Sequence, residues 1–209
     1  MSNDLANPFG KPAGEQDDRT PLHRAASNGQ LLLVRKLLSE GAQVDCQDEL
    51  NWTPLIIAAS AGHREIVELL ITSGASVNSR TTNNQTALHY AASKNRLEIC
   101  KLLVEAKAEL NARDNLRQTP LHRAALRGDV KLVQYLVGLP NIQLNPQDKV
   151  GNAPLHLACE DEREDIIKLF IDAGCDTTLA NADKKTPVET IVTHAIKRTI
   201  LNYLEQKKA

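Results

Sequence analysis

One short motif recurs along the chain at a nearly constant interval. Stretches of the form Thr-Pro-Leu-His, or close variants of it, begin at positions 20, 53, 86, 119, 153 and 186. A regular period of about 33 residues is typical of a solenoid, in which each repeat packs only on its neighbours. The period therefore predicts six stacked units that begin near positions 18, 51, 84, 117, 151 and 184.

Each unit carries the signals for two helices and a tight turn. Thr is a good N-cap, and Pro is tolerated at the first helical position because its missing N–H has no partner to lose there. A pair of alanines follows in the first four units, which lets neighbouring first helices approach closely. A second helix follows with apolar residues at helical spacing, as in Ile66, Val67 and Leu70. The turn between the two helices holds residues that tolerate a positive φ, namely Gly29, Gly62, Asn95 and Gly128.

The two ends of the chain depart from this pattern. In the sixth unit Ile191 and Val192 replace the alanine pair and Ala195 replaces the turn glycine, which predicts a C-terminal cap. Residues 1–16 are rich in Pro, Gly and Asn and are expected to form a flexible tail, so the repeat domain is assigned to residues 17–209.

Composition limits the classes of function. The net charge is −1 and no apolar run is long enough to span a membrane, so bulk charge and hydropathy favour neither nucleic-acid binding nor membrane insertion. The four cysteines form no C-x-x-C pair, so we expect reduced thiols and a location in the cytoplasm and nucleus. We further expect the isolated protein to be a monomer.

The six copies together resemble the ankyrin-repeat family from about residue 17 to the end. The resemblance implies an all-α solenoid of six helix-turn-helix units, with polar hairpin loops such as residues 45–52 and 111–118 projecting from it. It also implies that the hairpins and the exposed side of the first helices line a concave surface that binds a protein partner.

Charge changes sign along the positions that this concave surface comprises. The first hairpin is acidic, the middle of the stack is basic and the fifth unit is acidic again, which favours a folded partner with complementary patches. Trp52 at a hairpin base is either a binding anchor or a packing residue. The candidate partner-binding residues in these zones are Asp48, Glu49, Lys94, Arg96, Arg113, Arg117, Arg123, Arg127, Glu160 and Asp161. The closer similarity described in the next paragraph implies Asp17 and Arg19 as further contact residues.

A closer similarity lies with the proteasome-assembly chaperones of this family. It rests on the stretches ALHYAASKNR (87–96), GNAPLHLACEDER (151–163) and KKTP (184–187), and the divergence points to a fungal or other distant member. The similarity implies a non-catalytic chaperone of the 26S proteasome regulatory particle that binds the C-terminal domain of a base AAA ATPase subunit. Such chaperones have one further N-terminal repeat, where this chain has its short tail. The L-x-C-x-E motif of animal members reads Leu157, Cys159 and Asp161 here, and we do not carry its activity over.

The repeated histidines and the cysteines could form chemical sites or have structural roles. His23, His89, His122 and His156 share one repeat position, roughly 8–10 Å apart, too far to share a metal, so hydrogen bonds between units are expected. Cys100, Cys159 and Cys175 replace small buried residues, and Cys46 is expected to be exposed in a loop. No catalytic, metal or cofactor site is therefore predicted. The alternatives are an ankyrin-repeat regulator of a cyclin-dependent kinase or transcription factor and, less favoured, a hydrolase centred on Cys159.

Overall fold

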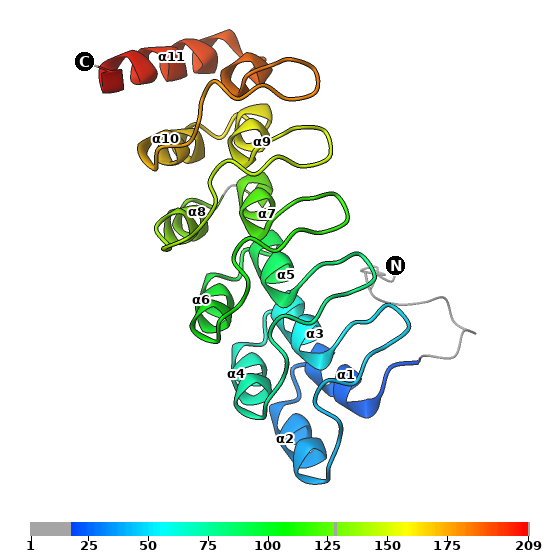
Figure 1. The fold of residues 1–209 in the computed structure, drawn as a ribbon. Coiled ribbons are helices and arrows are strands. Elements are labelled where there is room, and N and C mark those ends of the chain that lie inside the picture. The colour runs from blue at the N-terminus through cyan, green and yellow to red at the C-terminus, as the bar shows by residue number, and fades with distance from the viewer. Residues whose placement is uncertain (1–17, 128, 209) are drawn as a thin grey trace, which may run out of the picture.

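The computed structural model describes residues 18–127 and 129–208, which form a curved stack of paired helices (Figure 1). One row, here called the inner row, contains α1 (Pro21–Ser27), α3 (Pro54–Ala61), α5 (Ala87–Ser93), α7 (Pro120–Arg127), α9 (Pro154–Glu160) and the 3₁₀ helix η1 (Pro187–Thr190). The outer row contains α2 (Leu31–Ser39), α4 (Arg64–Thr72), α6 (Leu97–Glu105), α8 (Val130–Val137), α10 (Glu164–Asp172) and α11 (His194–Lys208). Hairpin loops project from the inner row on one side, which confirms the predicted all-α solenoid.

The local signals act as the sequence predicts. Thr20 and Thr53 cap α1 and α3 by accepting the backbone N–H three residues later. The inner helices end in left-handed residues, with φ of 71° at Gly29, 97° at Gly62 and 57° at Asn95. Gly128, the fourth predicted turn residue, lies outside the described residues. The alanine pairs are fully buried, so successive inner helices pack through methyl groups.

The core is continuous from the first unit to the last. Each inner helix contacts the next one, and the outer helices cover them with residues such as Leu70, Leu103, Leu136 and Phe170, all at most 1% exposed. The outer helix of the first unit is less covered. Leu33 of α2 is 39% exposed, although its counterpart Ile66 is 1% exposed, because Leu33 has no preceding described unit on which to pack.

The sixth unit differs from the predicted helix-turn-helix. Ala195 does not form the turn, because it lies inside α11, and Val192 is 88% exposed rather than paired in the core. Larger side chains in place of the alanines leave only the short η1 against α9, and Ile191 turns the chain in an extended conformation. The longer α11 then covers α10 as the C-terminal cap. The predicted tail, residues 1–16, lies outside the described residues.

Candidate protein-binding surface

Four buried histidines, here called the histidine ladder, tie the inner helices α1, α5, α7 and α9 to the unit that follows each of them. In His23, His89, His122 and His156 the ring Nδ1 accepts the backbone N–H of the N-cap residue, so Nε2 carries the proton. Nε2 donates to a carbonyl of the following unit, on Trp52, Gln118, Asn152 and Lys185, at 2.9, 3.1, 3.0 and 3.2 Å. The predicted hydrogen bonds between units are therefore confirmed.

The ladder keeps its interior rings neutral. Burial lowers the pKa of His89 to about 4, and it also lowers the pKa values of His122 and His156. His23 differs, because its pKa is raised: burial opposes the charged ring, but the contacts with Cys46 and the Trp52 carbonyl outweigh it. A neutral ring is what the ladder requires, because Nδ1 must accept while Nε2 donates.

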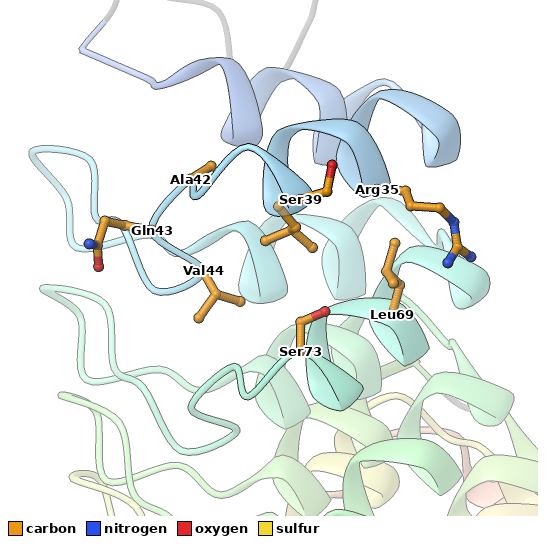
Figure 2. A pocket seen from close by; sticks show the side chains of 8 residues that line it. Arg35, Ser39, Ala42, Gln43, Val44, Leu69 and Ser73 are labelled. Carbon is orange, nitrogen blue, oxygen red and sulfur yellow. The ribbon is translucent and has the colours of Figure 1, made fainter.

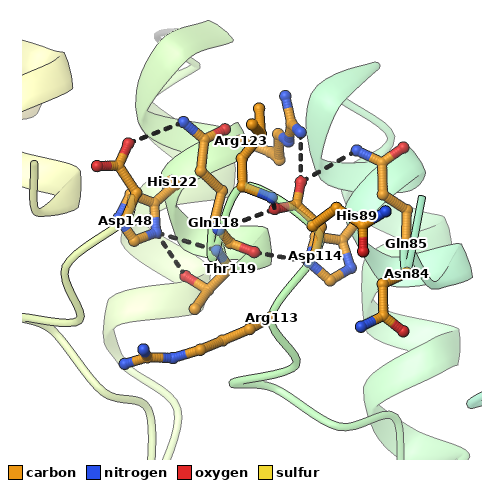
Figure 3. A network of polar contacts seen from close by, with 12 residues as sticks. Asn84, Gln85, His89, Arg113, Asp114, Gln118, Thr119, His122, Arg123 and Asp148 are labelled. Atoms are coloured by element: carbon orange, nitrogen blue, oxygen red, sulfur yellow. Dashed lines mark hydrogen bonds and ion pairs between the residues drawn. The ribbon is translucent and has the colours of Figure 1, made fainter. Parts of the chain in front are cut away.

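A second set of contacts runs along the hairpin bases (Figure 3). Asp114 accepts the N–H groups of Leu116 and Gln118 within its own loop, both at 2.9 Å, and Gln85 of the preceding hairpin donates to it at 3.2 Å. One hairpin later Asp148 repeats this arrangement and receives Gln118 Nε2 at 3.0 Å. These two hairpins are thus each folded by their own aspartate, and one glutamine of the preceding hairpin joins each aspartate to its neighbour.

Arg123 of α7 completes this network at the centre of the concave surface. Its Nη2 lies 2.5 Å from Asp114 Oδ2, and Asp114 is almost fully buried. Burial opposes the charge of Asp114, but the Arg123 guanidinium and the N–H donors hold the pKa of its carboxyl below the ordinary value. Beside this pair Trp52 packs on Tyr90, with ring centroids 4.3 Å apart. Trp52 is only 9% exposed, so its packing role is clear.

Some of the predicted basic residues are held by contacts within the chain, whereas others are exposed and remain available to a partner. Arg123 is committed to Asp114, and Arg96 donates to the Ala61 carbonyl at 3.1 Å, above Gly62. Lys94 and Arg127 occupy the same position at the ends of α5 and α7, and both are exposed. In the described part of the chain neither of them forms an ion pair.

Arg113 and Arg117 lie on the hairpin that follows unit three. Arg117 is exposed at the hairpin tip with a φ of 61°, and Arg113, which Figure 3 shows, is half-buried. They share this hairpin with Asp114 and lie apart from the ends of the inner helices. Apart from Arg19 and Arg123, the five remaining predicted basic residues therefore form two groups. Lys94, Arg96 and Arg127 lie at or just after the ends of inner helices, and Arg113 and Arg117 lie on a hairpin.

The acidic residues at the N-terminal side are less available than the sequence suggests. Asp48 is 7% exposed; it accepts the N–H groups of Leu50 and Trp52 and pairs with Arg19, whose Nε is 3.3 Å away. Glu49 is exposed on the same hairpin, and its N–H donates to Asp18. Asp17 lies outside the described residues. Arg19 and Asp48 thus close the first hairpin rather than present free charges.

The acidic zone of the fifth unit is exposed in part. Glu160 and Asp161 end α9 on the surface, and burial together with the nearby carboxylate of Asp148 raises the pKa of Glu160. Glu162 is directed elsewhere: its carboxylate accepts the N–H groups of Val192 and Thr193, at 2.9 and 2.5 Å, and so caps the start of α11. This contact explains why a residue with a φ of 54° is not glycine.

The cysteines offer no catalytic thiol in the packed interior. Burial raises the pKa of Cys100, Cys159 and Cys175 to about 12, so they are protonated at neutral pH, as expected of small buried residues. Cys46 is half-buried rather than exposed, which corrects the sequence prediction. Its Sγ lies 3.3 Å from Thr20 Oγ1 and 3.7 Å from His23 Nδ1, because the hairpin folds back over the start of α1.

A shallow groove of about 500 Å³ lies on the opposite side, between α2 and α4 (Figure 2). Leu38, Ala42, Val44 and Leu69 line it together with Arg35 and two serines. It lies away from the predicted binding residues, which are on inner helices and hairpins. Within residues 18–127 and 129–208, no group of three His, Cys, Asp or Glu side chains is placed to hold a metal ion. Among the helices of this described part, none combines the length and the apolar character that a membrane span requires.

Several residues of the surface were missed at the level of sequence. Asp114, Gln118 and Asp148 organise the hairpins, yet only their charged neighbours were singled out. A signal was present: polar residues recur at positions 48, 81, 114, 148 and 181, with the same spacing as the helix starts. Side chains repeated at the solenoid period lie in one row, so this spacing predicts a row of contacts.

Comparison with known proteins agrees with the architecture. The sequence matches the family of ankyrin repeats, described as three copies, over residues 5–81, 22–114 and 107–181. No curated protein matches the chain. Because the family match covers most of its length, the chain belongs to the ankyrin-repeat family. Members of this family are typically non-catalytic proteins that bind other proteins.

Proposed function

We propose that this ankyrin-repeat protein is a non-catalytic chaperone for assembly of the 26S proteasome regulatory particle, similar to gankyrin. Its proposed partner is the C-terminal domain of a base AAA ATPase subunit, bound on the concave surface, and its proposed location is the cytoplasm and nucleus. Support comes from the stretches ALHYAASKNR, GNAPLHLACEDER and KKTP, which resemble gankyrin more closely than the ankyrin pattern requires. Asn95 and Glu162, the unusual turn residues within two of these stretches, both take left-handed conformations.

A row of exposed charges on the inner helices gives the strongest support for this proposal. The same position at the end of successive inner helices reads Lys94, Arg127 and Asp161, all exposed. Free charges of this kind need no rearrangement to pair with a partner, unlike Arg123, which is already held by Asp114. A partner suited to this row has acidic side chains over α5 and α7 and a basic one over α9.

The test compares charge reversals on the two sides of the stack. The pure protein is titrated with the isolated C-terminal domain of each base ATPase subunit, by calorimetry. Lys94→Glu with Arg127→Glu is expected to weaken binding of one such domain at least about tenfold, through loss of two charge contacts and new repulsion. The matched control is Arg35→Glu with Lys131→Glu, which makes the same change of charge on the outer helices α2 and α8.

The possible results test the proposed partner and the proposed binding surface separately. If no ATPase domain binds the unaltered protein, the proposed partner is wrong. If a domain binds and the control double variant weakens it as much as the concave one, the proposed surface is wrong. Circular dichroism of both variants should be unchanged, because all four residues are exposed and form no ion pair within the described residues.

A further inference from the structure

Two neighbouring hairpins carry large apolar side chains at their tips. Leu116 is 51% exposed and Val150 is 57% exposed. The equivalent tips immediately before and after them hold Asn83 and Asp183, so the repeat pattern does not require an apolar residue there. A hydrogen bond of 3.0 Å from the Lys149 N–H to the Leu116 carbonyl joins the two tips. We call Leu116, Arg117, Lys149 and Val150 the tip patch.

The first hairpin has an exposed leucine at the same position but a different setting. Leu50 is 55% exposed, and the residue before it is the acidic Glu49, where the later hairpin has Lys149. The polar tip at Asn83 lies between Leu50 and the tip patch along the stack. Among the hairpin tips of the described residues, these two neighbouring tips therefore join exposed apolar side chains with positive charge.

The exposed charges of the tip patch are all positive. Arg117 and Lys149 are exposed next to the apolar residues in the sequence, and Arg113 of the first of these hairpins is half-buried. Within residues 18–127 and 129–208, none of these three cations forms an ion pair. The acids of the two hairpins, Asp114 and Asp148, are 5% exposed each and are occupied by their own loops. Apolar surface framed by unpaired positive charge is suited to a partner that is apolar and acidic.

The tips are held in place before any partner binds. The N–H groups of Leu116 and Val150 donate to the buried aspartates at 2.9 and 3.0 Å, and Gln118 links the two aspartates' loops. Binding to such loops costs little ordering entropy, because their backbone already has its partners. The tip patch therefore presents its apolar side chains from a backbone that is already held in one conformation.

We propose that the tip patch binds an acidic amphipathic helix of a protein partner, laid along the axis of the stack. Neighbouring units lie roughly 8–10 Å apart. Residues i and i+7 of a helix lie about 10.5 Å apart on one face. Apolar side chains at this spacing match Leu116 and Val150, and carboxylates beside them reach Arg117 and Lys149. This inference goes beyond the proposed chaperone function, since it does not depend on which protein is bound.

The test uses a synthetic probe. A fluorescein-labelled, alanine-rich peptide of about 20 residues is long enough to be helical in water. It carries Leu at positions i and i+7 and Glu at the flanking positions, and its binding to the full chain is followed by fluorescence anisotropy. The double variant Leu116→Ser with Val150→Ser and the double variant Arg117→Glu with Lys149→Glu are each expected to weaken binding about tenfold or more. Raising the salt concentration should weaken it further, because the charges are exposed.

Matched controls keep the result interpretable. Leu50→Ser removes a leucine of the same repeat position and similar exposure outside the patch, and Arg198→Glu with Arg35→Glu reverses two charges away from it. Neither is expected to change the affinity beyond twofold. The inference is overturned if the peptide does not bind, if the controls weaken binding as much as the tip variants, or if a peptide with Lys in place of Glu binds equally well. Because no ATPase domain is used, failure here leaves the proposed function standing.

Discussion

The interior units and the sixth unit use the same repeat position in different ways. In units three, four and five this position holds a buried histidine, which caps its own helix through Nδ1 and reaches the next unit through Nε2. In the sixth unit it holds Glu189, whose carboxylate accepts the Thr186 N–H at 2.7 Å and hydroxyl at 2.9 Å but is exposed. Both side chains cap a helix; only the histidine also needs a neighbouring carbonyl.

The start of the outer helix also differs between the interior units and the sixth unit. An interior outer helix follows a left-handed turn of its own unit, whereas α11 is capped by Glu162 from the unit before. The repeat position is therefore filled according to the neighbours that a unit has, not only according to the local helix signal. Four predictions test this difference, in order of decreasing effect.

Removing an interior histidine should lower the free energy of unfolding more than any other change proposed here. His122→Ala deletes a fully buried ring and leaves the Thr119 N–H and the Asn152 carbonyl without their partner. We expect a loss of about 2–4 kcal/mol in the free energy of unfolding, measured by urea denaturation. The control is Glu189→Ala at the same position of the sixth unit, which should lower stability far less. Equal losses would show that the inter-unit hydrogen bond is unimportant.

Acidification should destabilise the interior units through their neutral histidines. The pKa of His89 is about 4 in the folded chain and about 6.5 in the unfolded one, so the unfolded state binds more protons between these values. The stabilisation is complete above pH 6.5 and is lost as the pH falls towards 4, by about 1 kcal/mol per pH unit. Urea denaturation at pH 7, 6 and 5 measures it. His89→Gln should give a shallower slope, and an unchanged slope contradicts the assignment.

Removing the cap of α11 should loosen only the end of the chain. Glu162→Ala loses the carboxylate that accepts the Val192 and Thr193 N–H groups, so hydrogen exchange of α11 amides should accelerate about threefold to tenfold. Exchange in α7 should not change. Glu162→Gly loses the same cap but adopts the positive φ without strain, so its effect should be smaller than that of alanine. A uniform acceleration along the chain would refute a local role.

An exposed ion pair between two interior units should contribute least to the free energy of unfolding. Arg80 Nη2 lies 2.7 Å from Glu109 Oε2, but the two side chains are 35% and 52% exposed. Glu109→Ala should change the free energy of unfolding by less than about 1 kcal/mol, because solvent screens exposed pairs. Thermal melting at low and high salt provides the measurement. A loss as large as that from His122→Ala would mean that charge, rather than buried hydrogen bonding, joins the interior units.

Much of the fold could be predicted from the sequence because its signals are local and repeated. The Thr-Pro starts, the alanine pairs and left-handed residues such as Asn95 each depend on a few neighbouring residues, and six copies reinforce one another. The sixth unit was predicted less well. Its turn was assigned to Ala195 by analogy, although the bulk of Ile191 and the cap from Glu162 shift the helix start to His194.

The candidate surface was harder to predict, because charge in a sequence does not say whether it is already paired. Lys94, Arg127 and Asp161 are exposed, as a surface role requires, whereas Arg123 and Asp48 are taken up by ion pairs and loop N–H groups. Cys46 was misjudged for the same reason, since its contacts with Thr20 and His23 come from a hairpin folding back. The binding roles of the candidate residues stay predictions until the titrations are done.

The amino-acid sequence is enough to predict a stack of helical units, because the signals for the period, the caps and the turns are present in each copy of the repeat. Which polar side chains remain available to a partner depends on the tertiary structure. Contacts such as Gln118 with Asp148, or Glu162 with Thr193, join residues about one repeat apart in sequence. Whether such groups meet depends on how closely successive units stack, and that spacing arises from packing of the whole core rather than from any local signal.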